Sequence, residues 1–220
     1  MSLWIKICGT TSLADAQLAV EAGADAVGFV LARSPRQITP PAVSAIVAGL
    51  PSQVEKIGVF VDADLDTICT IAQDCGLTGV QLHFDTSSAL PGQLRERLGP
   101  SLRILQVVHF QAELLTPQVN RHARDPHIDA LLVDSRTAAA AGGTGTPFDW
   151  AEARKTVFVE QAQVKLVAAG GLNPANVARA IAILHPWGVD VVSGVEAAPG
   201  RKDPDKVRDF VARARTADRK

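Results

Sequence analysis

The sequence predicts an α/β fold in which residues 1–220 form one domain, a (βα)8 barrel. Eight apolar, strand-like runs occur along the chain, and a helical pattern follows each of them. Strands that are apolar throughout and alternate with helices form a parallel sheet that is covered on both faces. Eight such units in 220 residues fit a compact barrel. The alternative is an open, doubly wound sheet, but its usual first-turn signature, G-x-G-x-x-G, is absent.

Start and stop signals give the approximate bounds of each element. The strands are expected at residues 3–8, 26–31, 55–61, 79–83, 102–108, 129–134, 164–169 and 188–192. The helices that follow them are expected at about residues 12–23, 40–49, 64–75, 90–98, 112–123, 148–163, 173–184 and 203–214. The helix at 112–123 has the weakest apolar pattern.

Capping residues support two of the early helices. Ser12 is followed three residues later by Asp15, as in a capping box, and Gly23 is expected to end the same helix. Either Asp62 or Asp64 caps the third helix, because both precede its apolar pattern.

Similar signals occur late in the chain. Asn173 is expected as the N-cap of the seventh helix and Pro174 as its first residue. A long loop is expected at 135–147, and it holds the glycine-rich run 142–145.

Composition excludes several classes of protein. The net charge of −1 provides no field that attracts nucleic acid or an anionic membrane. No apolar run approaches the roughly 18 residues of a membrane span, and the N-terminus reads as a strand rather than a secretory signal. The three cysteines, Cys8, Cys69 and Cys75, lack the spacing of a zinc site or a disulfide framework. We therefore expect reduced thiols, no metal, and a cytoplasmic protein.

The first strand ends in a thiol. Because side chains alternate along a strand, Trp4, Lys6 and Cys8 share one face, while Ile5 and Ile7 share the other. Cys8 is then either a reactive group at the mouth of the barrel or a small buried hydrophobe. Lys6 either pairs with a buried carboxylate or, if it is close, lowers the pKa of the thiol.

Active sites of barrels lie at the C-terminal ends of the strands and in the loops that follow. The candidate residues at these ends are Cys8, Arg36, His83, Asp134, the run 142–145, Gly170, Gly171, Asp190, Ser193 and Gly194.

Two glycine-containing turns point to a phosphate. Gly170 and Gly171 follow the seventh strand, and Ser193 and Gly194 follow the eighth. Barrels commonly bind a phosphate at this place, through bare backbone N–H groups near a helix N-terminus. The alternative is a pair of ordinary turns.

Asp134 ends the sixth strand, three steps from the first strand around the ring. Cys8 and Asp134 are therefore expected to face each other across the barrel mouth. An isomerase that protonates one atom and deprotonates its neighbour needs an acid and a base placed in this way. As an alternative, Asp134 caps the segment that follows it.

Three further side chains have less specific roles. Arg36 could bind a carboxylate bidentately or be an ordinary solvated loop residue. His83 could be a rim or core histidine. Asp190 is expected to point inward by parity with Val192, where it could pair with a substrate hydroxyl.

Taken together and in order, the motifs resemble those of the phosphoribosylanthranilate isomerase family. The resemblance extends over essentially the full chain, and the ordered set is much more specific than any one motif. The segments that carry it are Lys6-Ile7-Cys8-Gly9, Ser34-Pro35-Arg36, Val80-Gln81-Leu82-His83, Asp134-Ser135, Gly142-Gly143-Thr144-Gly145, Ala169-Gly170-Gly171-Leu172-Asn173-Pro174, Ser193-Gly194-Val195-Glu196 and Pro199-Gly200-Arg201-Lys202-Asp203.

This resemblance implies a TIM barrel and an Amadori rearrangement in tryptophan biosynthesis. The implied substrate is N-(5-phosphoribosyl)anthranilate, the product is 1-(2-carboxyphenylamino)-1-deoxyribulose 5-phosphate, and no cofactor is needed. By the family pattern, Asp134 is the general acid and Cys8 the general base. Arg36 matches a residue near the anthranilate carboxylate, and the two glycine turns match the phosphate site.

The chain departs from the family pattern at two positions. Phe84 stands where the family usually has glycine, and Val192 stands where it often has serine. Val192 removes a hydroxyl near the expected phosphate site, so we expect altered affinity rather than lost activity.

Other functions remain open on the sequence alone. The histidine-branch ribonucleotide isomerase runs the same rearrangement, but its expected base on the first strand is a carboxylate, not Cys8. A ribulose-phosphate epimerase needs a set of His and Asp metal ligands that cannot be assembled from this sequence. A non-catalytic phosphosugar-binding barrel would keep the glycine turns and lose the acid or base. A small-molecule phosphoribosyl substrate and a monomer or homodimer are expected.

Overall fold

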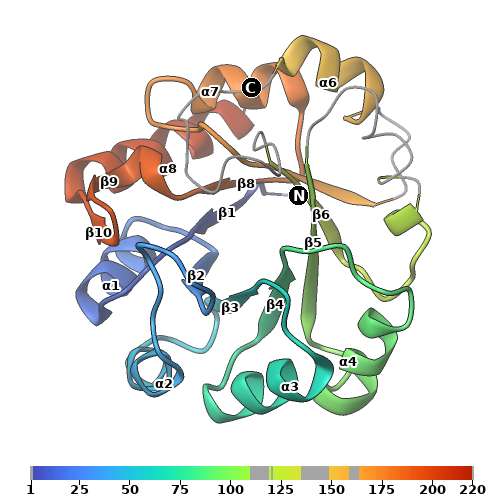
Figure 1. The fold of residues 1–220 in the computed structure, drawn as a ribbon. Helices are drawn as coiled ribbons and strands as arrows, with labels where there is room; N and C mark the ends of the chain where they lie inside the picture. The colour runs from blue at the N-terminus through green and yellow to red at the C-terminus, as the bar shows by residue number, and fades with distance from the viewer. Residues whose placement is uncertain (1, 110–118, 120, 135–148, 159–163, 220) are drawn as a thin grey trace.

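The computed structural model describes residues 2–109, 119, 121–134, 149–158 and 164–219. Eight parallel strands form a closed barrel in chain order, and β8 pairs with β1 to complete it (Figure 1). The predicted (βα)8 barrel is therefore confirmed. The strands are β1 (Trp4–Ile7), β2 (Ala26–Val30), β3 (Glu55–Phe60), β4 (Gly79–Leu82), β5 (Arg103–His109), β6 (Ala130–Asp134), β7 (Lys165–Ala168) and β8 (Gly188–Val191).

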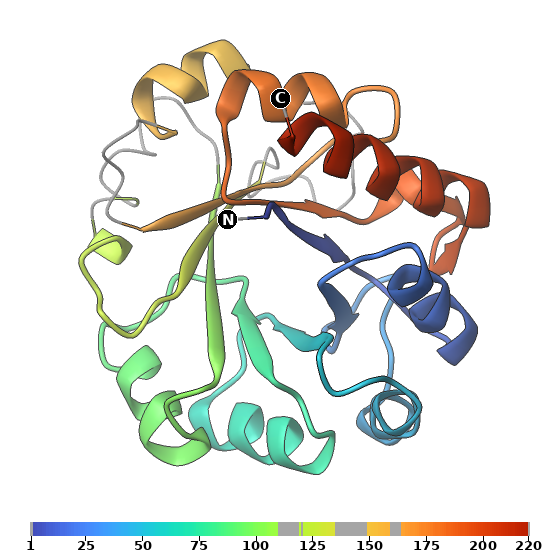
Figure 2. The same ribbon diagram turned by 180° about the vertical axis from the view of Figure 1, so that it is seen from behind.

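Helices surround the barrel on its outside, as the front and back views show (Figures 1 and 2). No helix within the described ranges is long and apolar enough to span a membrane. The helices are α1 (Leu13–Glu21), α2 (Pro40–Ala48), α3 (Leu65–Asp74), α4 (Leu90–Leu98), α6 (Trp150–Thr156), α7 (Val177–Leu184) and α8 (Pro204–Asp218).

The alternation of side chains predicted for the first strand is confirmed. Ile5 and Ile7 pack in the large apolar cluster that includes residues of the surrounding helices. Trp4 belongs to a second cluster of residues from the strands, which fills the inside of the barrel. Lys6 is on the same side as Trp4 and is completely buried. Inside the barrel, the apolar layer that includes Trp4 is therefore followed, two residues further along β1, by the buried polar side chain of Lys6.

Two predicted N-caps, Ser12 and Asp64, are seen in the structure. The Ser12 hydroxyl accepts a hydrogen bond from Asp15 N at 3.1 Å, and Gly23, with φ +95°, follows the C-cap of α1. Ala24 N donates to Ala19 O at 3.0 Å, which completes a Schellman motif. Of the two candidates for α3, Asp64 is the cap, since its carboxylate accepts from Thr67 N at 2.7 Å.

Other sequence-based bounds need correction. Asn173 is not the N-cap of α7, which begins at Val177 after Asn176. The Asn173 carboxamide instead caps a preceding turn by accepting from Ala175 N, and the Asn176 carboxamide oxygen accepts from Asn173 N. Most of the helix expected at 112–123 and the run 142–145 lie outside the described residues.

One element was not predicted at all. A short antiparallel hairpin, β9 (Glu196–Ala198) and β10 (Arg201–Lys202), follows a 3₁₀ turn at Ser193–Val195. The Thr11 hydroxyl donates to Gly200 O at 2.5 Å, so the hairpin lies against the loop that follows β1. The hairpin brings charged side chains from the end of the chain to the mouth of the barrel.

The opposite end of the barrel is closed by aromatic rings. Trp4 and Trp187 stack with ring centroids 5.2 Å apart and an interplanar angle of 20°. Lys165 Nζ lies 4.7 Å and Arg103 Cζ 5.5 Å from the Trp187 ring. A Cβ at Gly188 would lie 3.0 Å from the Trp4 ring, so glycine leaves the space that the indole fills. Stacking, cation–π attraction and burial all stabilise this end.

We expect Trp187→Ala to lower the free energy of unfolding by about 2–3 kcal/mol, because it removes the stack and both cation–π contacts. Denaturant unfolding followed by fluorescence measures the change. Trp187→Phe keeps a ring over Trp4 and should lose about 1 kcal/mol or less. Equal losses in the two variants would show that the stack is not the source of the stability.

Candidate active site

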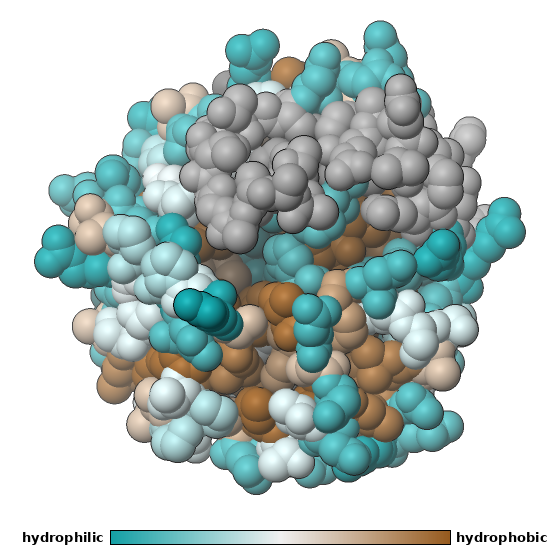
Figure 3. Space-filling model, in the orientation of Figure 1, coloured by the Kyte–Doolittle hydropathy of each residue, from teal (hydrophilic) through white to brown (hydrophobic). Residues whose placement is uncertain are grey.

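A cavity of about 530 Å³ opens where the barrel strands end. All five predicted side chains that have a titratable or cationic group line it: Cys8, Arg36, His83, Asp134 and Asp190. Both departures from the family pattern, Phe84 and Val192, line it as well. In the space-filling view, apolar side chains gather below the grey atoms, with strongly hydrophilic side chains among them and around the outline (Figure 3).

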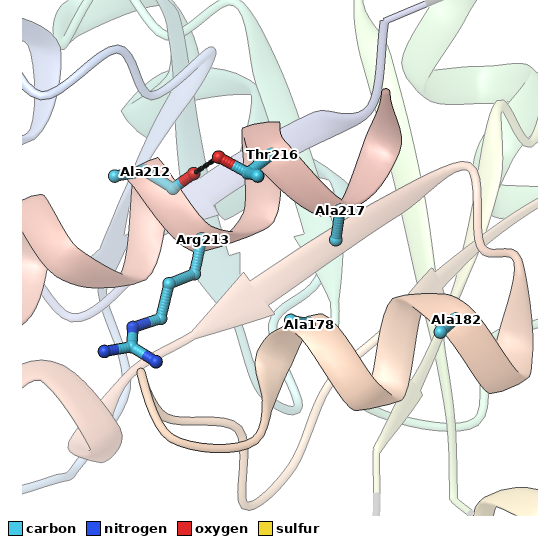
Figure 4. A pocket seen from close by; sticks show the side chains of 6 residues that line it. All are labelled: Ala178, Ala182, Ala212, Arg213, Thr216 and Ala217. Carbon is cyan, nitrogen blue, oxygen red and sulfur yellow. Dashed lines mark hydrogen bonds between the residues drawn. The ribbon is translucent and has the colours of Figure 1, made fainter. Parts of the chain in front are cut away.

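A second hollow lies on the outside of the barrel, between α7 and α8 (Figure 4). It measures about 370 Å³ and is lined by Ala178, Ala182, Ala212, Arg213, Thr216 and Ala217. Its polar groups are already engaged, since Arg213 pairs with Asp209 at 2.7 Å and the Thr216 hydroxyl donates to Ala212 O at 2.8 Å. Chemistry is therefore expected at the barrel mouth and not here.

Cys8 is buried at the top of β1, with 3% of its surface exposed. Its thiol occupies space that Gly28 leaves on the neighbouring strand. A Cβ at Gly28 would lie 2.5 Å from the Cys8 Sγ and 2.9 Å from the Lys6 Cε. A glycine at this place in β2 is therefore required for the thiol and the lysine to lie side by side.

A buried polar cluster lies directly below the thiol. Lys6 Nζ donates to Asp190 Oδ1 at 2.7 Å and to Gln81 Oε1 at 2.8 Å. Burial acts to lower the pKa of Lys6, but the charge of Asp190 and the neighbouring Cys8 raise it above its ordinary value. The buried carboxylate that was expected as the partner of Lys6 belongs to Asp190. Gln81 was not among the predicted site residues.

The pKa of the Cys8 thiol lies above its ordinary value, although Lys6 acts on it in the predicted direction. Burial raises the pKa of the thiol, and Asp190 raises it further. Lys6 and Lys202 act in the opposite direction and favour the thiolate. Sequence reasoning identified the favourable charge of Lys6, but it could not weigh that charge against complete burial.

Asp134 ends β6 and is buried, with 4% of its surface exposed. Its strand is separated from β1 by β7 and β8, so the two strands lie on different sides of the barrel mouth. In the ladder between β5 and β6, His109 is the neighbour of Asp134. The carboxyl and the Cys8 thiol therefore approach the same cavity from separate strands.

A histidine pair forms the wall next to Asp134. The His83 and His109 rings lie 5.3 Å apart, tilted by 47°. His109 Nδ1 is buried and has no hydrogen-bond partner in the described part of the chain. His109 was missed because the strand was expected to end one residue earlier. Gln106 fixes this region, since its carboxamide donates to Phe84 O at 2.9 Å.

Arg36 is not a solvated loop residue. Its Nε donates to Glu196 Oε1 at 2.8 Å and its Nη2 to Glu196 Oε2 at 2.7 Å. These hydrogen bonds raise the pKa of Arg36 above its ordinary value. Burial opposes the ionisation of Glu196, but Arg36 and Lys202 hold the pKa of its carboxyl below the ordinary value. Glu196 and Lys202 were not predicted as site residues, since they belong to the unexpected hairpin.

The two glycine turns meet each other in space. Gly170 and Gly171 have φ angles of +78° and +68°, which favour glycine. A Cβ at Gly194 would lie only 1.9 Å from Leu172 O, so this residue also has to be glycine. No backbone hydrogen bond among the described residues uses the N–H of Gly171 or Ser193. These four residues are not among the described residues that line the 530 Å³ cavity.

No group of three His, Cys, Asp or Glu side chains within the described ranges could hold a metal ion. The chemistry that the cavity supports with its own residues is proton transfer, by a thiol on one side and a carboxyl on the other.

Comparison with known proteins gives a consistent result. The model of the family described as "N-(5'phosphoribosyl)anthranilate (PRA) isomerase" matches residues 5–213. The N-(5'-phosphoribosyl)anthranilate isomerase of Geobacter sp. (strain M21) is 45% identical over 212 residues, which are 96% of this chain and 97% of the relative.

Two solved structures add information about ligand and assembly. A phosphoribosyl anthranilate isomerase in complex with reduced 1-(O-carboxyphenylamino)-1-deoxyribulose 5-phosphate is 35% identical, with a TM-score of 0.81 and coverage of 97% of this chain and 99% of that one. Monomers generated from the dimeric Thermotoga maritima isomerase are 34% identical, with the same TM-score and the same coverage.

We expect the Cys8 thiolate to form only above the ordinary pH range of a thiol, because burial raises its pKa. Titration of the thiolate absorbance in a Cys69→Ser/Cys75→Ser background measures this directly. Lys6→Met should move the midpoint to still higher pH, since it removes a cation and leaves Asp190 unpaired. Lys165→Met, at the other end of the barrel, is the control. A midpoint that stays or falls in Lys6→Met contradicts the electrostatic role of Lys6.

Proposed function

Since the chain belongs to the N-(5'-phosphoribosyl)anthranilate isomerase family, it is an isomerase of tryptophan biosynthesis, and we propose that Cys8 and Asp134 are its general base and general acid. The reaction converts N-(5-phosphoribosyl)anthranilate to 1-(2-carboxyphenylamino)-1-deoxyribulose 5-phosphate. One observation carries the assignment: a buried thiol directly after β1 and a buried carboxyl at the end of β6 line the same cavity.

The first step is opening of the ribose ring. Asp134 donates a proton to the ring oxygen, the C1–O bond breaks, and the nitrogen lone pair forms a Schiff base. The new hydroxyl keeps the proton, so no charge is left on the leaving oxygen. General acid catalysis of this kind contributes typically 10²–10⁴-fold to a rate.

The second step is removal of a proton from C2. The Cys8 thiolate takes this proton, the electron pair moves toward the Schiff base, and an enolamine forms that tautomerises to the ketone. C2 is oxidised and C1 is reduced, so the redox change is internal and no cofactor is required. The cations Lys6 and Lys202 favour the thiolate that this step needs, against the cost of burial.

The remaining cavity residues suit the rest of the substrate. Arg36 keeps the Nη1 edge of its guanidinium for the anthranilate carboxylate, because Glu196 takes only Nε and Nη2. Asp190 and His83 are assigned to the sugar hydroxyls. Gly170, Gly171, Ser193 and Gly194 are assigned to the phosphate, because Gly171 and Ser193 have N–H groups that join no backbone hydrogen bond in the described region.

We also propose that the enzyme is a single-domain, cytoplasmic protein. The barrel and its helices extend from Trp4 to Asp218, which supports one domain over residues 1–220. The three cysteines are free and buried, in keeping with a cytoplasmic enzyme that needs no disulfide. The small-molecule phosphoribosyl compound is the partner, with no nucleic acid or membrane, and the enzyme is a monomer or a homodimer.

We expect Cys8→Ser and Asp134→Asn each to lower kcat by at least about 10²-fold, since each removes one proton-transfer group. Turnover of freshly generated phosphoribosylanthranilate, followed by loss of its fluorescence, measures the rates. Cys75→Ser and Asp66→Asn are matched controls away from the cavity and should retain full activity. Turnover near the wild-type rate in either cavity variant, with both controls active, rules out that residue's assignment.

The pH profile provides an independent test of the base. A base acts when deprotonated, so kcat/KM should rise with pH through the pKa of Cys8, which burial raises. The rising limb should therefore continue past about pH 8.5, the ordinary thiol value. Its midpoint should equal that of the thiolate absorbance titration on the free enzyme. A limb that is complete below neutral pH would assign the base to a different group.

A further inference from the structure

Two charged side chains of the β9–β10 hairpin are buried, and neither gives or takes a proton in the proposed steps. The Glu196 side chain is 4% exposed and that of Lys202 is 0% exposed. Ionised groups at such depth cost free energy unless they are paired and hydrogen-bonded. Each of them is paired here, and the pairing leads directly to Arg36 and Cys8.

The carboxylate of Glu196 holds one edge of the Arg36 guanidinium. The hydrogen bonds use Nε and Nη2, which form the side of the planar group, at 2.8 and 2.7 Å. Nη1 has no hydrogen-bond partner among the described residues, and Arg36 lines the cavity. A guanidinium bound in this way presents its other edge, Nη1 with the second hydrogen of Nη2, to a second planar anion.

Other contacts prevent the carboxylate from rotating. Glu196 Oε1 also accepts from Gly200 N at 3.2 Å and lies 3.4 Å from Lys202 Nζ. Lys202 Nζ donates to Cys8 O at 2.5 Å and to Val192 O at 3.3 Å. The same ammonium therefore fixes Glu196 and the end of the strand that carries the thiol.

The backbone around the guanidinium is shaped for this pairing. Gly9 has φ +71°, and a Cβ there would lie 2.9 Å from the Arg36 Cδ and 3.1 Å from the Val192 Cγ1. The Arg36 stem thus lies against the turn that follows Cys8. Arg36 and Lys202 both pair with the single carboxylate of Glu196. These three side chains therefore keep one net positive charge for an anionic ligand.

We propose that Glu196 is a positioning residue, which orients Arg36 toward the carboxylate of the substrate, and that Lys202 holds Glu196 in a fixed position relative to Cys8. The inference rests on the proposed function, in which Arg36 binds that carboxylate. Glu196 does not touch the substrate. It fixes the orientation of the group that does, so that binding of the carboxylate sets the distance between the ribose and the thiol.

The test compares Glu196→Gln in two backgrounds. In the wild-type background, loss of the bidentate pair should raise KM for phosphoribosylanthranilate about tenfold, with a smaller change in kcat. Arg36→Met should raise KM at least as much. In the Arg36→Met background, the same glutamine substitution should change KM less than twofold, because the residue through which it acts is gone. An equal effect in both backgrounds overturns the proposal, since Glu196 would then act through the fold.

A matched control exists at the other end of the barrel. Arg103 and Glu55 form a similar side-on pair, with Nη2 to Oε1 at 2.6 Å and Nε to Oε2 at 3.3 Å. Glu55→Gln should leave KM unchanged. If Glu196→Gln does not fold, Glu196→Asp replaces it, because aspartate keeps the charge and shortens the reach by one methylene. The aspartate variant should show the same raised KM and the same dependence on Arg36.

A binding measurement separates this inference from the proposed function. Calorimetry compares the reduced product analogue with an analogue that lacks the ring carboxyl group. The wild-type enzyme should prefer the carboxylate form at least about tenfold, and Glu196→Gln should lose most of that preference. If Arg36→Met keeps the preference, the assignment of Arg36 fails. If Arg36→Met loses it and Glu196→Gln keeps it, only the role of Glu196 fails.

Discussion

The ion pair between Lys6 and Asp190 is the interaction on which the rest of the site depends. Lys6 belongs to the first strand and Asp190 to the last, and they are neighbours in the ladder that closes the barrel. Gln81 joins the pair from β4, on another part of the ring. The same ion pair therefore joins the two strands that close the sheet and forms the centre of the polar interior. A buried lysine without this carboxylate would cost more free energy than the barrel could readily supply.

The barrel is divided along its axis by the type of side chain inside it. At one end, the stack of Trp4 and Trp187 closes the barrel and carries no proton-transfer group. Above it lie the ionised pair, then the thiol and the carboxyl at the open end. The residues that stabilise the closed end and those that carry the proton-transfer groups thus lie only a few positions apart along each strand. This separation allows polar groups to be buried at the mouth while the floor remains apolar.

Much of the fold could be predicted because it depends on local patterns. Alternating apolar strands and helices gave the barrel, and the caps Ser12 and Asp64 gave helix starts within a residue or two. Candidate site residues at strand ends, such as Asp134 and Asp190, followed from the same pattern.

Glu196 and Lys202 could not be found in this way. Their hairpin has strands of two and three residues, too short for a periodic signal, and Glu196 meets Arg36 across 160 positions. The net pKa direction of Cys8 was also out of reach, because it is a balance between burial and charges that only coordinates provide.

The hydrogen bond from Lys202 to the carbonyl of Cys8 joins residues 194 positions apart. A ribosome therefore delivers the thiol 194 residues before its supporting ammonium. A fragment that ends before Lys202 lacks this hydrogen bond, even when all eight strands of the barrel have been made. Contacts of such sequence separation also slow folding, since a long segment must be ordered before they form. Such a fragment has the thiol and Lys6 but lacks the second cation, Lys202, that favours the thiolate.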